Sequence, residues 1–155
     1  MTSPFMARAI QLAIENVRSG QGGPFGAVIV KDGNVIAEGA NSVTAANDPT
    51  AHAEVVAIRQ ACQKLGLFEL KNCDLYTSCE PCPMCMGAIY WARLARVYFA
   101  SLAADASQAG FDDSFIYREI AKSHAVRGIP MIQIMREEAL AAFRAWAEKP
   151  NKIPY

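Results

Sequence analysis

The chain has 155 residues, of which 52% are hydrophobic, and its 15 basic and 15 acidic residues give zero formal net charge. That length is enough for one core but short for two independent domains, so a single domain over residues 1–155 is predicted. The balanced charge argues against nucleic acid as the main partner, and no hydrophobic run is long enough to span a membrane.

The N-terminal segment is predicted to form an amphipathic helix that ends near Ser19. Ser3 and Pro4 are a capping residue and a proline suited to the first helical position. Apolar side chains then recur at helical spacing at Met6, Ile10, Ala13 and Val17. Charged and polar residues interrupt the segment, which excludes a signal peptide.

A β-hairpin and a second helix are predicted next. Two β-prone runs, 25–30 and 35–41, flank the turn sequence Lys-Asp-Gly-Asn at 31–34. Asp48 and Pro49 then precede a helical pattern that Gly66 closes.

The middle of the chain is predicted to alternate strands with a helix. A short strand at 74–78 leads into a cysteine cluster. The following segment, 82–94, has a helical pattern with Pro83 in its first turn, and 96–100 is another strand.

The C-terminal part is predicted to add one more strand between two helices. The helical pattern at 112–123 precedes a β-prone run at 131–135, and the last helix covers 136–149. Prolines make residues 148–155 an extended tail. The element order predicts an α/β fold, a three-layer α-β-α sandwich around a five-stranded mixed β-sheet.

The five cysteines indicate metal chemistry rather than a disulfide framework. Their number is odd, and Cys79, Cys82 and Cys85 stand too close together for cross-linking, which favours a reducing, cytoplasmic location. An iron–sulfur cluster would need a further cysteine after Cys85, and a thioredoxin-like pair would not have a third cysteine beside it. A tetrahedral metal ion matches the two-residue gap between Cys82 and Cys85.

His52 and Glu54 supply what a zinc site at the cysteines would need, namely a third ligand and a proton acceptor. Both lie at a predicted helix start, where an imidazole can meet the thiolates of Cys82 and Cys85 on one Zn²⁺ that keeps a fourth position for water. Glu54 is then placed to accept a proton. The alternative is a closed structural zinc site in which Cys79 is the fourth ligand and the protein only binds partners.

The motifs "NDPTAHAEV" and "YTSCEPCPMCMGAIYWAR" combine His-x-Glu with Pro-Cys-x-x-Cys, the signature of zinc nucleobase deaminases. The chain resembles the cytidine deaminase-like superfamily and, through "GPFGAVIVKDG", "AGFDDSFIY" and its C-terminal tyrosine, the short bacterial guanine deaminases. The resemblance implies hydrolysis of guanine to xanthine and ammonia, with zinc on His52, Cys82 and Cys85, Cys79 outside the metal shell, and Glu54 as the proton carrier.

The residues that recognise a purine are less specific in the sequence. Phe25 and Trp91 can stack on the base and Asn41 can bond its edge, although on the residues alone core packing and a turn are the stronger explanations. Asp113 alone reads as a helix cap, and the resemblance makes it a second acid/base group.

The same resemblance implies a homodimer in which the C-terminal segment crosses over and Tyr155 covers the partner's site. A tRNA adenosine deaminase shares the zinc motif, but this chain has no lysine or arginine clusters for phosphates. A deaminase of free cytidine or cytosine is a further alternative. In such an enzyme the "FDD" sequence at 111–113 would have no evident role.

Overall fold

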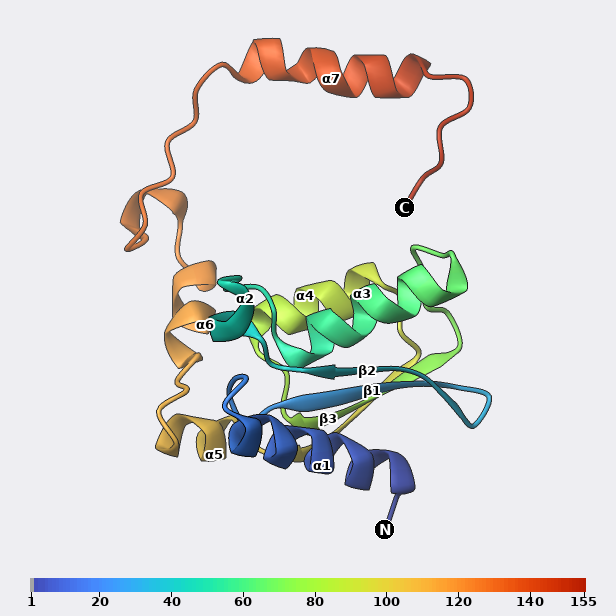
Figure 1. Ribbon diagram of the computed structural model, residues 1–155. Helices are drawn as coiled ribbons and strands as arrows, with labels where there is room; N and C mark the ends of the chain where they lie inside the picture. The colour runs from blue at the N-terminus through green and yellow to red at the C-terminus, as the bar shows by residue number, and fades with distance from the viewer. Residues whose placement is uncertain (1) are drawn as a thin grey trace. The chain divides into compact units, whose positions relative to one another are not determined.

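A computed structural model describes residues 2–155 (Figure 1). The chain divides into two units, Met1–Asp113 and Ser114–Tyr155, and each is described by itself. Across the described residues, no helix is long and apolar enough to cross a membrane.

The first unit is built on a mixed sheet that has four strands within the described chain. The strands are β1 (Gly26–Lys31), β2 (Asn34–Ala40), β3 (Cys73–Cys79) and β4 (Arg96–Ser101), in the spatial order β2-β1-β3-β4. β1 runs antiparallel to both β2 and β3, whereas β3 and β4 are parallel. The predicted hairpin is therefore confirmed as β1 and β2.

Helices cover both faces of this sheet. The helices of this unit within the described residues are α1 (Pro4–Ser19), α2 (Val43–Ala46), α3 (Ala53–Leu65), α4 (Pro83–Trp91) and α5 (Ala103–Gln108). α1 lies on one face, and α3 and α4 lie side by side on the other (Figure 1). α4 connects the parallel strands β3 and β4, as a crossover helix should.

Strand β1 shows why the sheet needs a helix layer on each face. Successive side chains of a strand point to opposite sides. Ala27 and Ile29 join the core under α3 and α4, and Val28 and Val30 join the core under α1. A central strand covered on both faces is accordingly apolar at consecutive positions.

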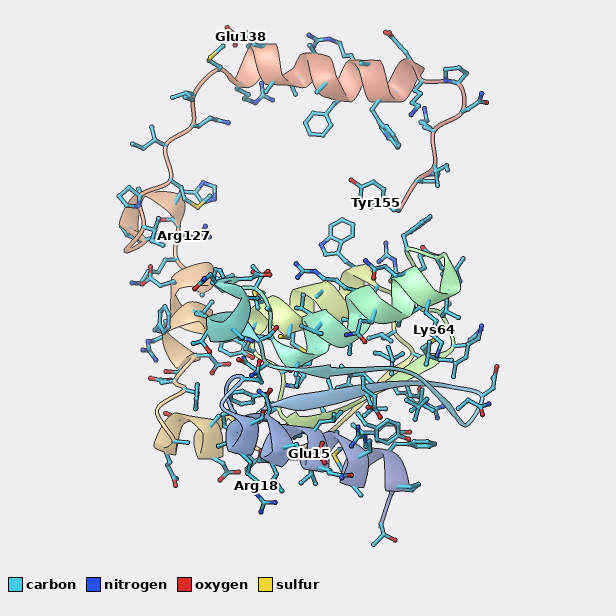
Figure 2. The ribbon with its side chains drawn as sticks, viewed as in Figure 1. Glu15, Arg18, Lys64, Arg127, Glu138 and Tyr155 are labelled. Carbon is cyan, nitrogen blue, oxygen red and sulfur yellow. The ribbon has the colours of Figure 1, made fainter. Side chains whose placement is uncertain are left out.

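The predicted first helix is confirmed, but its buried face is rotated from the predicted stripe. Ser3 caps α1 by accepting a hydrogen bond from the Met6 N–H at 3.4 Å. Ile10 and Val17 are 38% and 51% exposed, whereas the buried residues of the helix are Ala9, Ala13 and Asn16. Arg18 points away from the sheet (Figure 2). Small residues face the sheet because α1 packs close to β1, where Gly26 has no side chain.

The prediction of a fifth strand at 131–135 is wrong. These residues form neither helix nor strand, and the sheet ends at β4 within the described chain. The alternating pattern is present, yet Ile132 and Ile134 are 82% and 76% exposed. A β-prone segment becomes a strand only when a neighbouring strand pairs with its backbone, and here none does in the described chain.

The second unit consists of helices and connecting chain. It contains α6 (Ser114–Ala121), the 3₁₀ turn η1 (His124–Val126) and α7 (Arg136–Glu148). The predicted last helix is thereby confirmed, and residues 149–155 follow it without further helix or strand.

Gly39 on β2 allows α3 to lie close to the sheet. A Cβ atom at this position would be 2.3 Å from the Ala53 carbonyl oxygen and 2.7 Å from the Ala57 nitrogen. Both of those are backbone atoms of the first turns of α3, so they cannot rotate away. The absence of a side chain at Gly39 therefore fixes the position of the α3 N-terminus.

Replacing Gly39 with alanine is expected to push α3 off the sheet and to destabilise the fold by about 1–3 kcal/mol, the usual cost of overpacking. Urea unfolding followed by circular dichroism measures the change. Gly87→Ala is the matched control, because a Cβ at Gly87 in α4 meets nothing within 4 Å. Equal stability of the two variants would show that the approach of α3 is not tight.

Candidate metal centre and cavity

The starts of α3 and α4 bring one imidazole and two thiols together. His52 and Cys82 are the N-cap residues of the two helices, both with extended backbone. Their carbonyl oxygens accept the first helical hydrogen bonds, from the N–H groups of Val56 and Met86, both at 2.9 Å. Cys85 follows in the first turn of α4, where Pro83 begins the helix.

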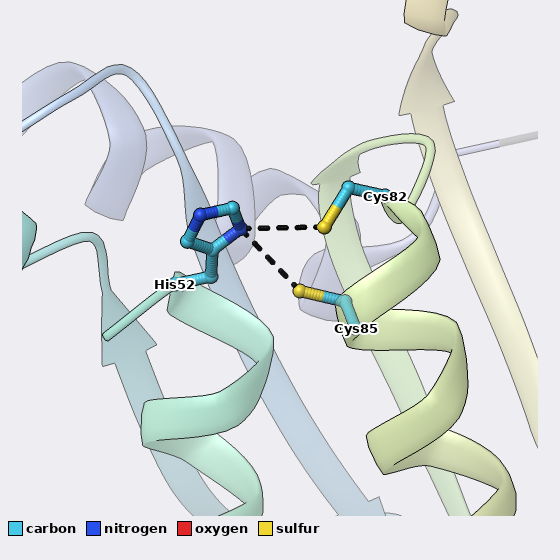
Figure 3. Close-up of side chains that lie close together, drawn as sticks. All are labelled: His52, Cys82 and Cys85. Atoms are coloured by element: carbon cyan, nitrogen blue, oxygen red, sulfur yellow. Dashed lines mark hydrogen bonds between the residues drawn. The ribbon is translucent and has the colours of Figure 1, made fainter. Parts of the chain in front are cut away.

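The Nδ1 atom of His52 lies 3.5 Å from the Cys82 sulfur and 3.5 Å from the Cys85 sulfur (Figure 3). All three candidate ligand atoms lie within 4.8 Å of one another. With Zn–S bonds of about 2.3 Å and Zn–N bonds of about 2.0–2.1 Å, tetrahedral ligands lie about 3.5 Å apart. The spacing and the donor atoms therefore fit zinc.

The protonation of the two thiols also suits a metal. Hydrogen bonding from the Cys85 thiol, together with His52, lowers the pKa of Cys82 to about 4. The hydrogen bond with Cys82 in turn raises the pKas of His52 and Cys85. One thiolate is thus present at neutral pH before any metal binds, and thiolate is the form that ligates metal.

Cys79 is separate from this cluster. It ends β3, is buried, and its sulfur lies 3.7 Å from the Leu102 carbonyl oxygen. Burial raises its pKa, which favours the neutral thiol. Among the described residues, the group of possible metal ligands at this site contains His52, Cys82 and Cys85 without Cys79. The geometry supports an open three-ligand site rather than the closed cage considered from the sequence.

Glu54 lies in the first turn of α3 and is only 6% exposed. Burial raises the pKa of its carboxyl, and its side chain interacts with the Cys85 thiol. A buried carboxyl group beside the ligands of a metal ion can take up and return a proton.

These residues open onto a cavity of about 450 Å³ in the first unit. Six of the predicted site residues line it, namely Phe25, Asn41, His52, Glu54, Cys82 and Asp113, and so does Cys79. A cavity of this size accepts a small planar molecule, and its lining combines aromatic rings with a few polar groups.

Asn41 presents a defined edge to this cavity. It directly follows β2, and its Oδ1 accepts hydrogen bonds from the N–H groups of Gly23 at 3.2 Å and Val43 at 3.4 Å. These two backbone donors fix the orientation of the Asn41 amide.

Asp113 is the last residue of the first unit, and burial and the charge of Cys82 raise the pKa of its carboxyl. The raised value favours a group that carries a proton more readily than an ordinary aspartate does.

Two of the predicted substrate-binding residues, Trp91 and Tyr155, are not among the residues that line the cavity. Trp91 ends α4 and is 63% exposed. Tyr155 belongs to the second unit and is 75% exposed. Their roles in substrate binding stay predictions.

Phe111 is a cavity residue that the sequence reasoning missed. Its ring meets that of Phe25 edge to face, with centroids 5.0 Å apart. Phe111 stands two positions before Asp113 in the motif "AGFDDSFIY". Its closeness to a predicted catalytic residue is the sequence feature that could have indicated a place in the cavity. The short helix α2 and its Thr44 also line the cavity and were not predicted.

Comparisons with known proteins agree with this geometry. The family model for the cytidine and deoxycytidylate deaminase zinc-binding region matches residues 1–101. A guanine deaminase of Bacillus subtilis (strain 168) is 60% identical over 151 residues, which cover 97% of each protein. A solved structure of guanine deaminase from Bacillus subtilis superposes with a TM-score of 0.97 at 59% identity, covering 100% of this chain and 99% of that one.

A tRNA-specific adenosine deaminase of Aquifex aeolicus (strain VF5) shares less of the chain. It is 47% identical over 79 residues, which are 51% of this chain and 52% of that protein.

Zinc content should follow the three clustered ligands. We expect about one equivalent of zinc per chain, lost in Cys82→Ser because a thiolate ligand disappears, and kept in Cys79→Ser. Metal analysis by mass spectrometry after dialysis measures both. Loss of zinc in Cys79→Ser alone would contradict the open three-ligand site.

Proposed function

The chain belongs to the family defined by the cytidine and deoxycytidylate deaminase zinc-binding region, and on that premise we propose that it is a guanine deaminase. It hydrolyses guanine to xanthine and ammonia. The observation that carries the proposal is 60% identity to a guanine deaminase along 97% of both proteins. That match extends beyond the zinc motifs into the segments that hold Asp113 and the C-terminal residues.

The chemistry divides among the residues of the cavity. His52, Cys82 and Cys85 would hold zinc, which would supply a Lewis acid able to make water a nucleophile near neutral pH. Glu54 would accept a proton from the attacking water and deliver it to the purine ring as the new C2–O bond forms. Asp113 assists the departure of the amino group as ammonia, and its raised pKa suits proton transfer.

Recognition of the base rests on stacking and directed hydrogen bonds. Phe25 stacks on the planar ring, and the Nδ2 group of Asn41 donates to an acceptor on its edge. Trp91 is proposed as a second stacking residue, and Tyr155 is proposed to cover the site of a partner subunit.

We further propose that the active form is a homodimer with an exchanged C-terminal segment. Ile129, Ile132 and Ile134 are 81%, 82% and 76% exposed in the single chain, and such an apolar surface favours burial against another copy. Residues 1–155 form one deaminase domain per subunit in this proposal, and 148–155 are a tail that covers an active site. Five free thiols support a cytoplasmic location.

Deamination of a tRNA adenosine fits less well. The similarity to a tRNA-specific adenosine deaminase covers about half of the chain, whereas the similarity to a guanine deaminase covers nearly all of it. Carboxyl groups of Glu54, Glu80 and Asp113 line the cavity without a lysine or arginine among the lining residues. Such a lining disfavours a phosphate backbone.

Zinc-loaded protein is expected to release ammonia from guanine but not from adenine, cytosine or the corresponding nucleosides. Glu54→Gln should keep zinc, because the residue is not a ligand, and lose at least about 100-fold in kcat, the scale of acid–base catalysis. A coupled ammonia assay and metal analysis measure the two properties. Full activity of Glu54→Gln would remove the proposed proton carrier, and turnover of adenine or cytosine instead of guanine would overturn the substrate assignment.

Deletion of residues 150–155 should lower guanine turnover sharply while leaving the zinc content unchanged, because the deleted tail is proposed to close a site. Light scattering should give about twice the chain mass of 16.8 kDa for the intact protein. Unchanged kinetics of the shortened chain would refute the role of the tail.

A further inference from the structure

Asn16 is a polar residue in a core position. It lies on α1 with Ala9 and Ala13 among the buried residues of the helix, and only 7% of its surface is exposed. Burying an amide is costly unless its polar atoms are hydrogen-bonded. The other buried residues of this helix are apolar, so the hydrogen bonds of the amide must explain why Asn16 is buried.

The Nδ2 atom of Asn16 uses both of its donors on backbone carbonyl oxygens from two separate segments. It donates to the Gly23 oxygen and to the Asn41 oxygen, each at 2.8 Å. Gly23 belongs to the glycine-rich loop after α1, and Asn41 directly follows β2. One side chain therefore holds two segments together.

The two joined segments form one wall of the cavity, since Gly22, Gly23 and Asn41 all line it. Their backbones are in close contact, because a Cβ at Gly22 would be 2.1 Å from the Asn41 oxygen. The Gly23 N–H also donates to Oδ1 of Asn41 and so sets which face of that amide meets a ligand. A loop rich in glycine has many accessible conformations, and the bonds from Asn16 select one of them.

We propose that Asn16 is a positioning residue for purine binding. It holds Gly23 so that the loop orients the Asn41 amide, whose Nδ2 group donates to the base. Asn16 lies on α1, whereas the metal ligands and Glu54 lie on or before α3 and α4, so its loss weakens substrate binding without disabling the chemical step. The inference rests on the proposed function, with guanine as the base.

Two variants of Asn16 test this. Asn16→Asp keeps the size of the side chain but sets acceptor oxygens against two carbonyl oxygens, and Asn16→Ser keeps a single, shorter donor. We expect KM for guanine to rise about tenfold in Asn16→Asp, the equivalent of about one lost hydrogen bond, and less in Asn16→Ser. In both variants kcat should stay within about threefold, because Glu54 and the metal are undisturbed.

Gln11→Ala is the matched control. It removes a side-chain amide from the exposed face of the same helix, where the amide bonds Glu15 at 2.7 Å, so KM should not change. Metal analysis and melting temperatures accompany the kinetics, and calorimetry of 8-azaguanine binding gives a readout that is independent of turnover.

A purely structural Asn16 would lower the melting temperature of both variants and leave KM and 8-azaguanine affinity at the wild-type values, which overturns the inference. A fall in kcat at unchanged KM also overturns it. If Asn16→Asp does not fold, Asn16→Ser decides alone. The proposed reaction can fail separately from the positioning role. If the wild-type protein binds 8-azaguanine but does not turn over guanine, the proposed reaction is refuted. If the variants then lose affinity for 8-azaguanine, the positioning role still holds.

Discussion

The site depends on the meeting of two helix N-termini. α3 and α4 lie on the same face of the sheet, and their N-cap residues, His52 and Cys82, bring a ring nitrogen and a sulfur to 3.5 Å. An N-cap residue has extended backbone, so its side chain projects beyond the helix end rather than along its flank. Buried packing of Ile58 and Ile89 in one core cluster keeps the helices in place. A change that separates the two N-termini would move the three candidate ligand atoms apart.

The proposed recognition of the base uses a different part of the fold. The candidate metal ligands lie at the starts of α3 and α4, while the glycine loop after α1 and the residue after β2 form another wall of the cavity. Asn16 links that wall to α1, and the sheet links it to the candidate metal ligands through β1. Binding and chemistry can therefore vary separately, which suits a fold whose relatives have different nucleobase substrates.

The sequence predicts the elements with strong local signals and misses those that depend on partners. The Ser3 cap and the hairpin turn are local patterns that appear where expected, and the two separate motifs that hold His52 and the Cys82–Cys85 pair do come together. The segment 131–135 alternates like a strand, but strand formation requires a neighbour that local pattern does not supply. Asn16 was overlooked because an amide on a helix normally indicates a solvent-facing position, and its two backbone acceptors become visible only in three dimensions.

Hydrolysis at this site requires that the metal keep one coordination position open beside Glu54. X-ray absorption at the zinc edge of the purified protein measures the ligand set directly. We expect two sulfur ligands at about 2.3 Å and two nitrogen or oxygen ligands at about 2.0–2.1 Å. Three sulfur ligands would instead place Cys79 on the metal, close the site and leave no position from which water could attack a bound base.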